Sequence, residues 1–143
     1  MKTKLMRIMA MIGLAMALTA AASAQTAQRY RAEIGFGFSI GGQQFAAGDY
    51  IIEQANPSSG LAGLKITSVE TGKSRIFSAM VESGDESESP KRLVFNRYGE
   101  QFFLRSVETP TMTARIGQRR GEIRASRNMN ATRVTVALGN AAR

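Results

Sequence analysis

Apolar and polar residues alternate from residue 33 to residue 40, which is the pattern of a β-strand with one buried face. The apolar face of this expected strand consists of Ile34, Phe36, Phe38 and Ile40. Gly35 and Gly37 occupy the opposite face and mark a bend or a close approach of another backbone. The pair Gly41-Gly42 tolerates positive φ at both positions, so it predicts a tight hairpin turn.

Short runs rich in β-branched and aromatic residues continue to residue 107, separated by turn-forming glycine, proline, asparagine and aspartate. The expected strands span residues 43–45, 50–55, 61–68, 74–81, 92–97 and 101–107. Within 74–81 the apolar residues do not alternate cleanly, which predicts a strand buried on both faces. The runs on either side of Tyr98-Gly99-Glu100 predict the clearest hairpin of the chain.

This succession of strands predicts an all-β, mainly antiparallel fold. Roughly six or seven short strands, with turns about every 8 to 12 residues, are typical of a small sandwich or a small barrel, and the pattern is compatible with both. We expect the β domain to span residues 25–108, and a basic, partly helical segment to span residues 109–143.

The C-terminal segment has a less regular pattern. Thr109 is a suitable N-cap for a helix, and Pro110 is a suitable first helical residue. One narrow apolar stripe of this helix would contain Met112, Ile116 and Ile123. Gly117 and Gly121 each cost about 1 kcal/mol relative to alanine, so we predict a weak helix that forms on docking. Residues 134–138 predict a last short strand.

Residues 1–24 have the pattern of a secretory signal peptide. Basic residues precede an uncharged apolar run over residues 8–20. Ala22 and Ala24 supply the small side chains that signal peptidase requires, which predicts cleavage after Ala24. The apolar run is shorter than the roughly 20 residues that a membrane-spanning helix needs. We therefore expect a protein that is exported to the periplasm or the cell exterior and is soluble after cleavage.

Charge is distributed unevenly along the chain. The whole sequence carries 19 basic and 11 acidic side chains, a net charge of +8. Residues 25–108 are nearly neutral, whereas residues 109–143 hold seven arginines against a single acidic residue, Glu122. Such a segment attracts polyanions. For an exported protein we expect these to be anionic lipids, anionic glycans or acidic proteins, with no nucleic acid. The candidate binding residues are Arg115, Arg119, Arg120 and Arg124.

The absence of histidine and cysteine excludes several kinds of catalytic and metal site. Ser-His-Asp triads, thiol nucleophiles and zinc sites built on imidazole or thiolate are not possible. We expect no enzymatic activity, no cofactor and no metal. A hydrolase that uses carboxylates alone is an alternative, with Glu82, Glu86 and Glu100 as candidates. Most of the nearby acids lie in the polar run 82–90, where water keeps carboxylates ionised.

A second candidate binding site is Asn96-Arg97-Tyr98 at the tip of the clearest hairpin. A tyrosine beside an arginine offers a stacking surface and paired hydrogen-bond donors to a sugar or a carboxylate. The alternative is structural. In that case Tyr98 covers the edge of the core, and Arg97 pairs with Glu100 or Glu108.

Three successive motifs resemble a group of small exported proteins abundant in Acidobacteria. They are FGFSIGG at 36–42, AGDY at 47–50 and LVFNRYGEQFFL at 93–104. The group's pattern is a PFDF-like strand with a glycine turn, LPAGxY, and a LVFHRYGDxYFL-like hairpin. The resemblance covers roughly residues 30–108 and implies export and a β architecture, with no assigned activity. Asn96 stands where the group has histidine, and Ile34 and Gly37 stand where it has proline and aspartate, so a role of that histidine does not transfer.

The sequence favours an exported, non-catalytic β module that binds an anionic envelope component or a protein through the arginine-rich segment. A structural scaffold is the second hypothesis. There the segment folds back, residues 134–138 complete the sheet, and the arginines pair with the acidic residues of 82–88. The carboxylate-only hydrolase is the third. The ligand and the oligomeric state are left open by the sequence.

Overall fold

The computed structural model describes residues 28–55, 63–83 and 90–141. The predicted leader, residues 1–24, lies outside the described residues, as do most residues of the acidic run after Glu82. Within the described part of the chain, no helix is long and apolar enough to cross a membrane.

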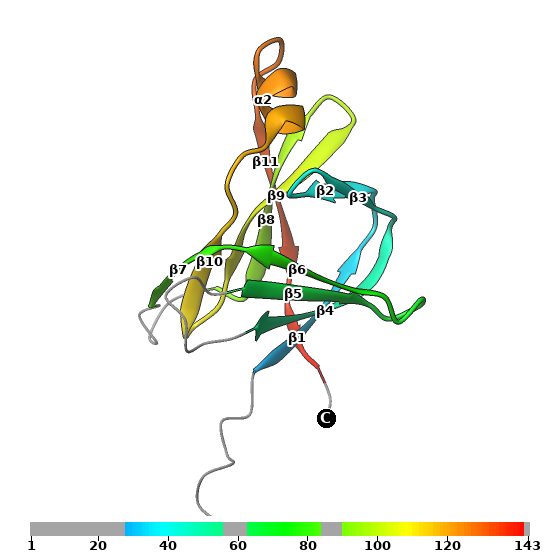
Figure 1. The fold of residues 1–143 in the computed structure, drawn as a ribbon, viewed down its shortest axis with the longest axis vertical. Helices are drawn as coiled ribbons and strands as arrows, with labels where there is room; N and C mark the ends of the chain where they lie inside the picture. The colour runs from blue at the N-terminus through cyan, green and yellow to red at the C-terminus, as the bar shows by residue number, and fades with distance from the viewer. Residues whose placement is uncertain (1–27, 56–62, 84–89, 142–143) are drawn as a thin grey trace, which may run out of the picture.

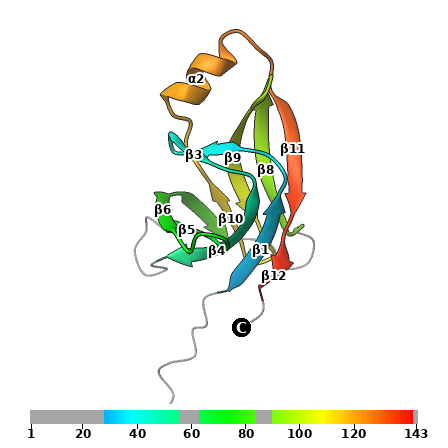
Figure 2. The ribbon, with the colours of Figure 1, turned by 90° about the vertical axis from the view of Figure 1, so that its right-hand side faces the viewer.

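Two β-sheets pack face to face and form a sandwich that does not close into a barrel (Figures 1 and 2). The first sheet has the order β12 (Gly139–Asn140), β1 (Arg29–Ile34), β4 (Gly48–Ala55), β5 (Gly63–Ser68) and β6 (Ser74–Ser78). The second has the order β11 (Thr132–Ala137), β8 (Arg92–Tyr98), β9 (Gln101–Glu108), β10 (Met112–Arg115) and β7 (Met80–Ser83). A hairpin of β2 (Phe38–Ile40) and β3 (Gln43–Phe45) joins the second sheet.

The predicted all-β, mainly antiparallel fold is confirmed. Of the two predicted architectures, the structure has the sandwich and not the barrel. Among the described residues, every strand pair is antiparallel except β2 with β9, which meet in parallel at Ser39 and Phe103. The predicted bend at Gly35 to Gly37 separates β1 in the first sheet from β2 in the second. The predicted Gly41-Gly42 turn is also confirmed, because it connects β2 and β3 with φ angles of 59° and 90°.

Aromatic side chains fill the centre of the sandwich. Phe95 and Phe38 are fully buried, and their ring centroids lie 5.5 Å apart in an edge-to-face arrangement. Phe36 meets Phe95 in the same geometry at 5.2 Å. The ring of Tyr50 packs edge to face against that of Phe38, with their centroids 5.3 Å apart. The Tyr50 hydroxyl donates a hydrogen bond to the backbone carbonyl of Ala46. These contacts join residues from both sheets into one core.

The predicted helix beginning at Thr109 is wrong. Thr109 is fully buried, and its Oγ1 accepts a hydrogen bond from the backbone N–H of Met112 at 3.1 Å within a tight turn. The following residues form β10, in which Met112 and Ala114 are buried while Arg115 is exposed. Alternate burial is the pattern of a strand, so the threonine and proline signal belongs to a β-turn. The one helix described, α2 (Arg120–Ser126), begins eleven residues later.

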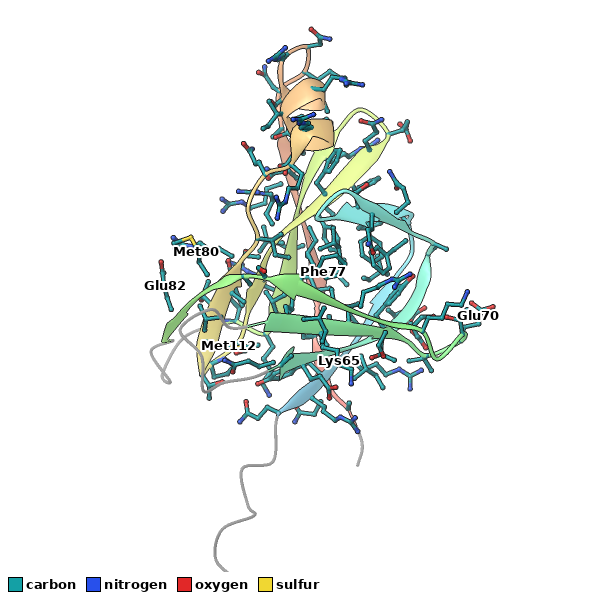
Figure 3. All side chains as sticks on the ribbon, in the orientation of Figure 1. Lys65, Glu70, Phe77, Met80, Glu82 and Met112 are labelled. Atoms are coloured by element: carbon teal, nitrogen blue, oxygen red, sulfur yellow. The ribbon has the colours of Figure 1, made fainter. Side chains whose placement is uncertain are left out.

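The prediction that 74–81 forms one strand buried on both faces is also wrong. The segment bends at Ala79 and contributes β6 to the first sheet and β7 to the second. Ile76 is 63% exposed and Met80 is 73% exposed, and Figure 3 shows Met80 pointing away from the molecule. Phe77 and Ala79 point inward instead. Inward and outward side chains therefore do alternate along this segment. The alternation is not visible in the sequence because the outward residues Ile76 and Met80 are also apolar.

A carboxylate on the first sheet gives a pH-dependent prediction. Glu53 on β4 accepts hydrogen bonds from Lys65 on β5 and from Arg29 on β1, each at 2.7 Å. These bonds hold the pKa of Glu53 below its ordinary value of 4.5. Because the pKa of Glu53 is lower in the folded state, its ionised carboxylate stabilises the fold at pH values above the unfolded-state pKa. This stabilisation is lost as the pH falls through the folded-state pKa.

We expect Glu53→Gln to lower the free energy of unfolding by about 1 kcal/mol at pH 7, since both partners are partly exposed. The difference from the wild type should persist down to about pH 4.5 and shrink toward zero below it. Urea unfolding across this range measures it. The matched control is Glu100→Gln, because Glu100 is 93% exposed. An effect of Glu53→Gln that does not depend on pH would contradict the account.

Candidate functional site: a basic helical cap

Residues 116–131 form a cap over the second sheet, beside the turn between β8 and β9. The cap consists of α2 with the segments before and after it. Figures 1 and 2 show α2 at one end of the long axis of the molecule, while β12 and the start of β1 lie toward the other end. The cap therefore projects from the body of the sandwich.

Backbone and side-chain groups of the second sheet hold the cap in place. The backbone N–H of Ile116 donates to the carbonyl of Arg105 at 2.8 Å, and Arg105 Nη1 donates to the carbonyl of Ile116 at 2.7 Å. Glu122 on α2 is only 4% exposed. Its carboxylate accepts hydrogen bonds from Asn96 Nδ2 at 3.1 Å and from Arg105 Nη1 at 3.4 Å. The single acidic residue of the C-terminal segment thus points inward and is neutralised by the sheet.

The helical period then places arginines on the outer face of the cap. Glu122 and Ala125 are the buried positions of α2. Residues three and four apart share a helix face, so the opposite face carries Arg120, Ile123, Arg124 and Arg127. All four side chains are exposed. Considering only described residues, none of these arginines lies within 4.0 Å of a carboxylate oxygen.

A cavity of about 340 Å³ lies beneath the cap, between α2, the β2–β3 hairpin and β9. Its polar and apolar lining includes Ser39, Gln44, Gln101, Phe103, Arg119 and Arg124. Amide and guanidinium groups donate hydrogen bonds to anionic oxygens, and Phe103 offers an apolar ring surface. The cavity and the outer face of α2 share Arg124, so the two surfaces are continuous.

The structure separates the four arginines predicted to act together. Arg119, Arg120 and Arg124 gather on the cap. Arg115 lies on β10, where its Nη1 is 3.3 Å from a carboxylate oxygen of Glu82 on β7. Sequence reasoning did not single out Arg127, although its spacing from Arg120 and Arg124 would place it on the same helix face.

Asn96-Arg97-Tyr98 makes the contacts of the structural alternative. Asn96 donates to Glu122, and Tyr98 is buried with its ring 5.8 Å from that of Phe103. Arg97 Nη2 donates to Glu100 at 3.2 Å, and its Nε donates to the carbonyl of Gly99. Of the two partners expected for Arg97, the structure has Glu100, whereas Glu108 accepts from Arg92 at 2.7 Å. This hairpin tip therefore supports the cap.

The carboxylates considered for hydrolysis lie on different elements. Glu82 is on β7 and Glu100 is in the turn between β8 and β9, and each forms an ion pair with an arginine. Glu86 lies outside the described residues. Within residues 28–55, 63–83 and 90–141, no group of three acidic side chains is arranged to hold a metal ion.

Comparisons with known proteins give no family for this chain. No protein-family model matches it, no curated protein matches it, and no solved structure matches it. The resemblance to the exported Acidobacteria group therefore stays a prediction.

Proposed function

We propose that this protein is an exported, non-catalytic β module that binds an anionic component of the cell envelope through its helical cap. One observation carries the proposal. Arg119, Arg120, Arg124 and Arg127 are exposed on the cap, whereas Glu122, the acidic residue between them, is buried and engaged by Arg105. The cap therefore presents a surface of one sign of charge.

Arginine suits this role because its planar guanidinium donates paired hydrogen bonds to phosphate, sulfate and carboxylate groups. The guanidinium stays charged at any physiological pH, so binding does not depend on titration. Attachment to a sheet also matters, since a fixed array loses less conformational freedom on binding than a free tail. Export restricts the available polyanions to lipids, glycans and acidic proteins, which is why nucleic acid is not proposed.

The test is binding of short-chain dextran sulfate by calorimetry at about 50 and 200 mM salt. We expect salt-dependent binding, and we expect the variant Arg120→Gln, Arg124→Gln, Arg127→Gln to bind about 100-fold more weakly, at about 1 kcal/mol per arginine. The charge-matched control is Lys73→Gln, Arg75→Gln, Arg115→Gln. All six side chains are exposed, so both variants should fold.

The control also examines a competing location. Lys73 and Arg75 line a second cavity of about 480 Å³ beside β3 and β6. A larger loss of binding in the control variant than in the cap variant would overturn the proposal and favour that cavity. Binding that is absent, or equally weak in both variants, would also overturn it.

A structural scaffold is the second candidate function, and the position of the C-terminal strands favours it. β11 pairs with β8 along six residues from Thr132 to Ala137, and β12 pairs with β1. Arg115 pairs with Glu82 at the start of the acidic run. A wild-type protein with full stability and no affinity for any polyanion would select this alternative.

A further inference from the structure

Two large apolar side chains are exposed on the same cap that carries the arginines. Ile123 is 41% exposed on the outer face of α2, and Met129 is 43% exposed in the segment after the helix. Met129 lies over the turn between β8 and β9, where its Sδ is 3.2 Å from the position that a Cβ on Gly99 would occupy. The tip of the molecule is therefore both basic and apolar.

The order of residues along α2 brings these two properties together. Ile123 is one turn from Arg120, which precedes it, and one turn from Arg127, which follows it. Arg124 is its immediate neighbour in sequence. The helical spacing thus places exposed arginines before and after Ile123 on the outward face of α2.

A soluble polyanion would use only the arginines of this arrangement and would leave Ile123 and Met129 in water. A bilayer with acidic headgroups would use both, because apolar side chains enter the interface while arginines remain at the level of the phosphates. Position also favours a flat partner. The cap is at one end of the long axis, so a planar surface reaches it without meeting β5 or β6 (Figure 1).

We infer that the cap docks on an anionic phospholipid bilayer, with Ile123 and Met129 inserted into the interface and Arg120, Arg124 and Arg127 on lipid phosphates. This inference rests on the proposed function and names its partner. No covalent chemistry is involved. The sandwich stays in water and is held at the membrane surface by its tip.

The sequence contains no tryptophan, so a single introduced indole reports its own surroundings. We expect Ile123→Trp to show a blue-shifted emission, and quenching by brominated acyl chains, on vesicles of phosphatidylglycerol and phosphatidylcholine. Vesicles of phosphatidylcholine alone should leave the spectrum unchanged. The matched control is Ile76→Trp, which places the indole at another exposed apolar position, on β6. Its emission should not shift.

A second variant separates insertion from charge. We expect the double variant Ile123→Ser, Met129→Ser to weaken vesicle binding about tenfold, while dextran sulfate binding stays unchanged. Each side chain is less than half exposed, so the two together contribute about as much as one fully buried apolar side chain. Retained dextran sulfate binding with no vesicle binding, or with no shift at Ile123→Trp, would overturn the inference and leave the proposed function standing. A wild-type protein that binds neither dextran sulfate nor the anionic vesicles would overturn the proposed function itself. A shift at Ile76→Trp would place the membrane on β6 and also overturn the inference.

Discussion

Replacing Phe95 with alanine is expected to lower the free energy of unfolding by about 3–5 kcal/mol, the largest loss expected from any single substitution considered for this protein. Phe95 is fully buried on β8 and makes edge-to-face contacts with Phe36 and Phe38. Both partners come from the segment that crosses from the first sheet to the second. Removing the ring leaves a cavity at the junction of the two sheets, where the surrounding strands have little freedom to collapse.

Equilibrium unfolding in urea, followed by circular dichroism, measures this loss. A loss of this size is a large fraction of the roughly 5–15 kcal/mol that stabilises a typical domain, so Phe95→Leu is examined in parallel and should lose about 1–2 kcal/mol. Ile76→Ala, at a position 63% exposed, should change stability by less than about 0.5 kcal/mol. Equal effects of Phe95→Ala and Ile76→Ala would contradict the assigned core.

The second large effect is expected at Glu122. Replacement by alanine should cost about 2–3 kcal/mol, because it removes the carboxylate that accepts from the Asn96 amide and that pairs with the guanidinium of Arg105, which keeps its bond to the Ile116 carbonyl. The loss is smaller than for a fully buried pair, since the Arg105 side chain is 28% exposed. Glu122→Gln keeps an acceptor oxygen and should cost about 1 kcal/mol.

Amide hydrogen exchange shows where the Glu122 substitution acts. In Glu122→Ala we expect faster exchange of the α2 amides than in the wild type, with little change in β4 and β5. Glu82→Ala is the control, because Glu82 also pairs with an arginine but is 55% exposed, so its loss should be below about 0.5 kcal/mol. If Glu122→Ala were as stable as Glu82→Ala, the buried carboxylate would not anchor the cap.

The strands could be predicted because local alternation reports directly which residues face the core. This rule identified Ile34, Phe38 and Ile40 as buried. The same rule also holds for residues 112–115, where a helix-start signal favoured the wrong element. Thr109-Pro110 resembles a helix start, yet the alternate burial of Met112 and Ala114 continues the sheet. The tertiary pairing of β10 with β9 and β7 decided the outcome, and no local pattern contains that pairing.

The candidate site was predictable in its charge but not in its geometry. Counting residues found the arginines, and helical spacing groups Arg120 with Arg124. Arg115 lies apart from the cap arginines and pairs with Glu82, a residue on a strand distant in the sequence. The anchoring of Glu122 depends on Arg105 and Asn96, which are 17 and 26 residues distant. Such nonlocal contacts arise from the pairing of sheets and leave no periodic trace.

The most direct measurement of the central claim is an NMR titration of the isotope-labelled protein with tripolyphosphate, a small soluble polyanion. If the folded cap is the anion site, the largest amide shifts should fall on residues 117–129 and on the Gly41-Gly42 turn beside them. They should weaken as salt is added. Shifts centred on Lys73 and Arg75, or shifts spread evenly over all the basic residues, would show that the cap has no special role.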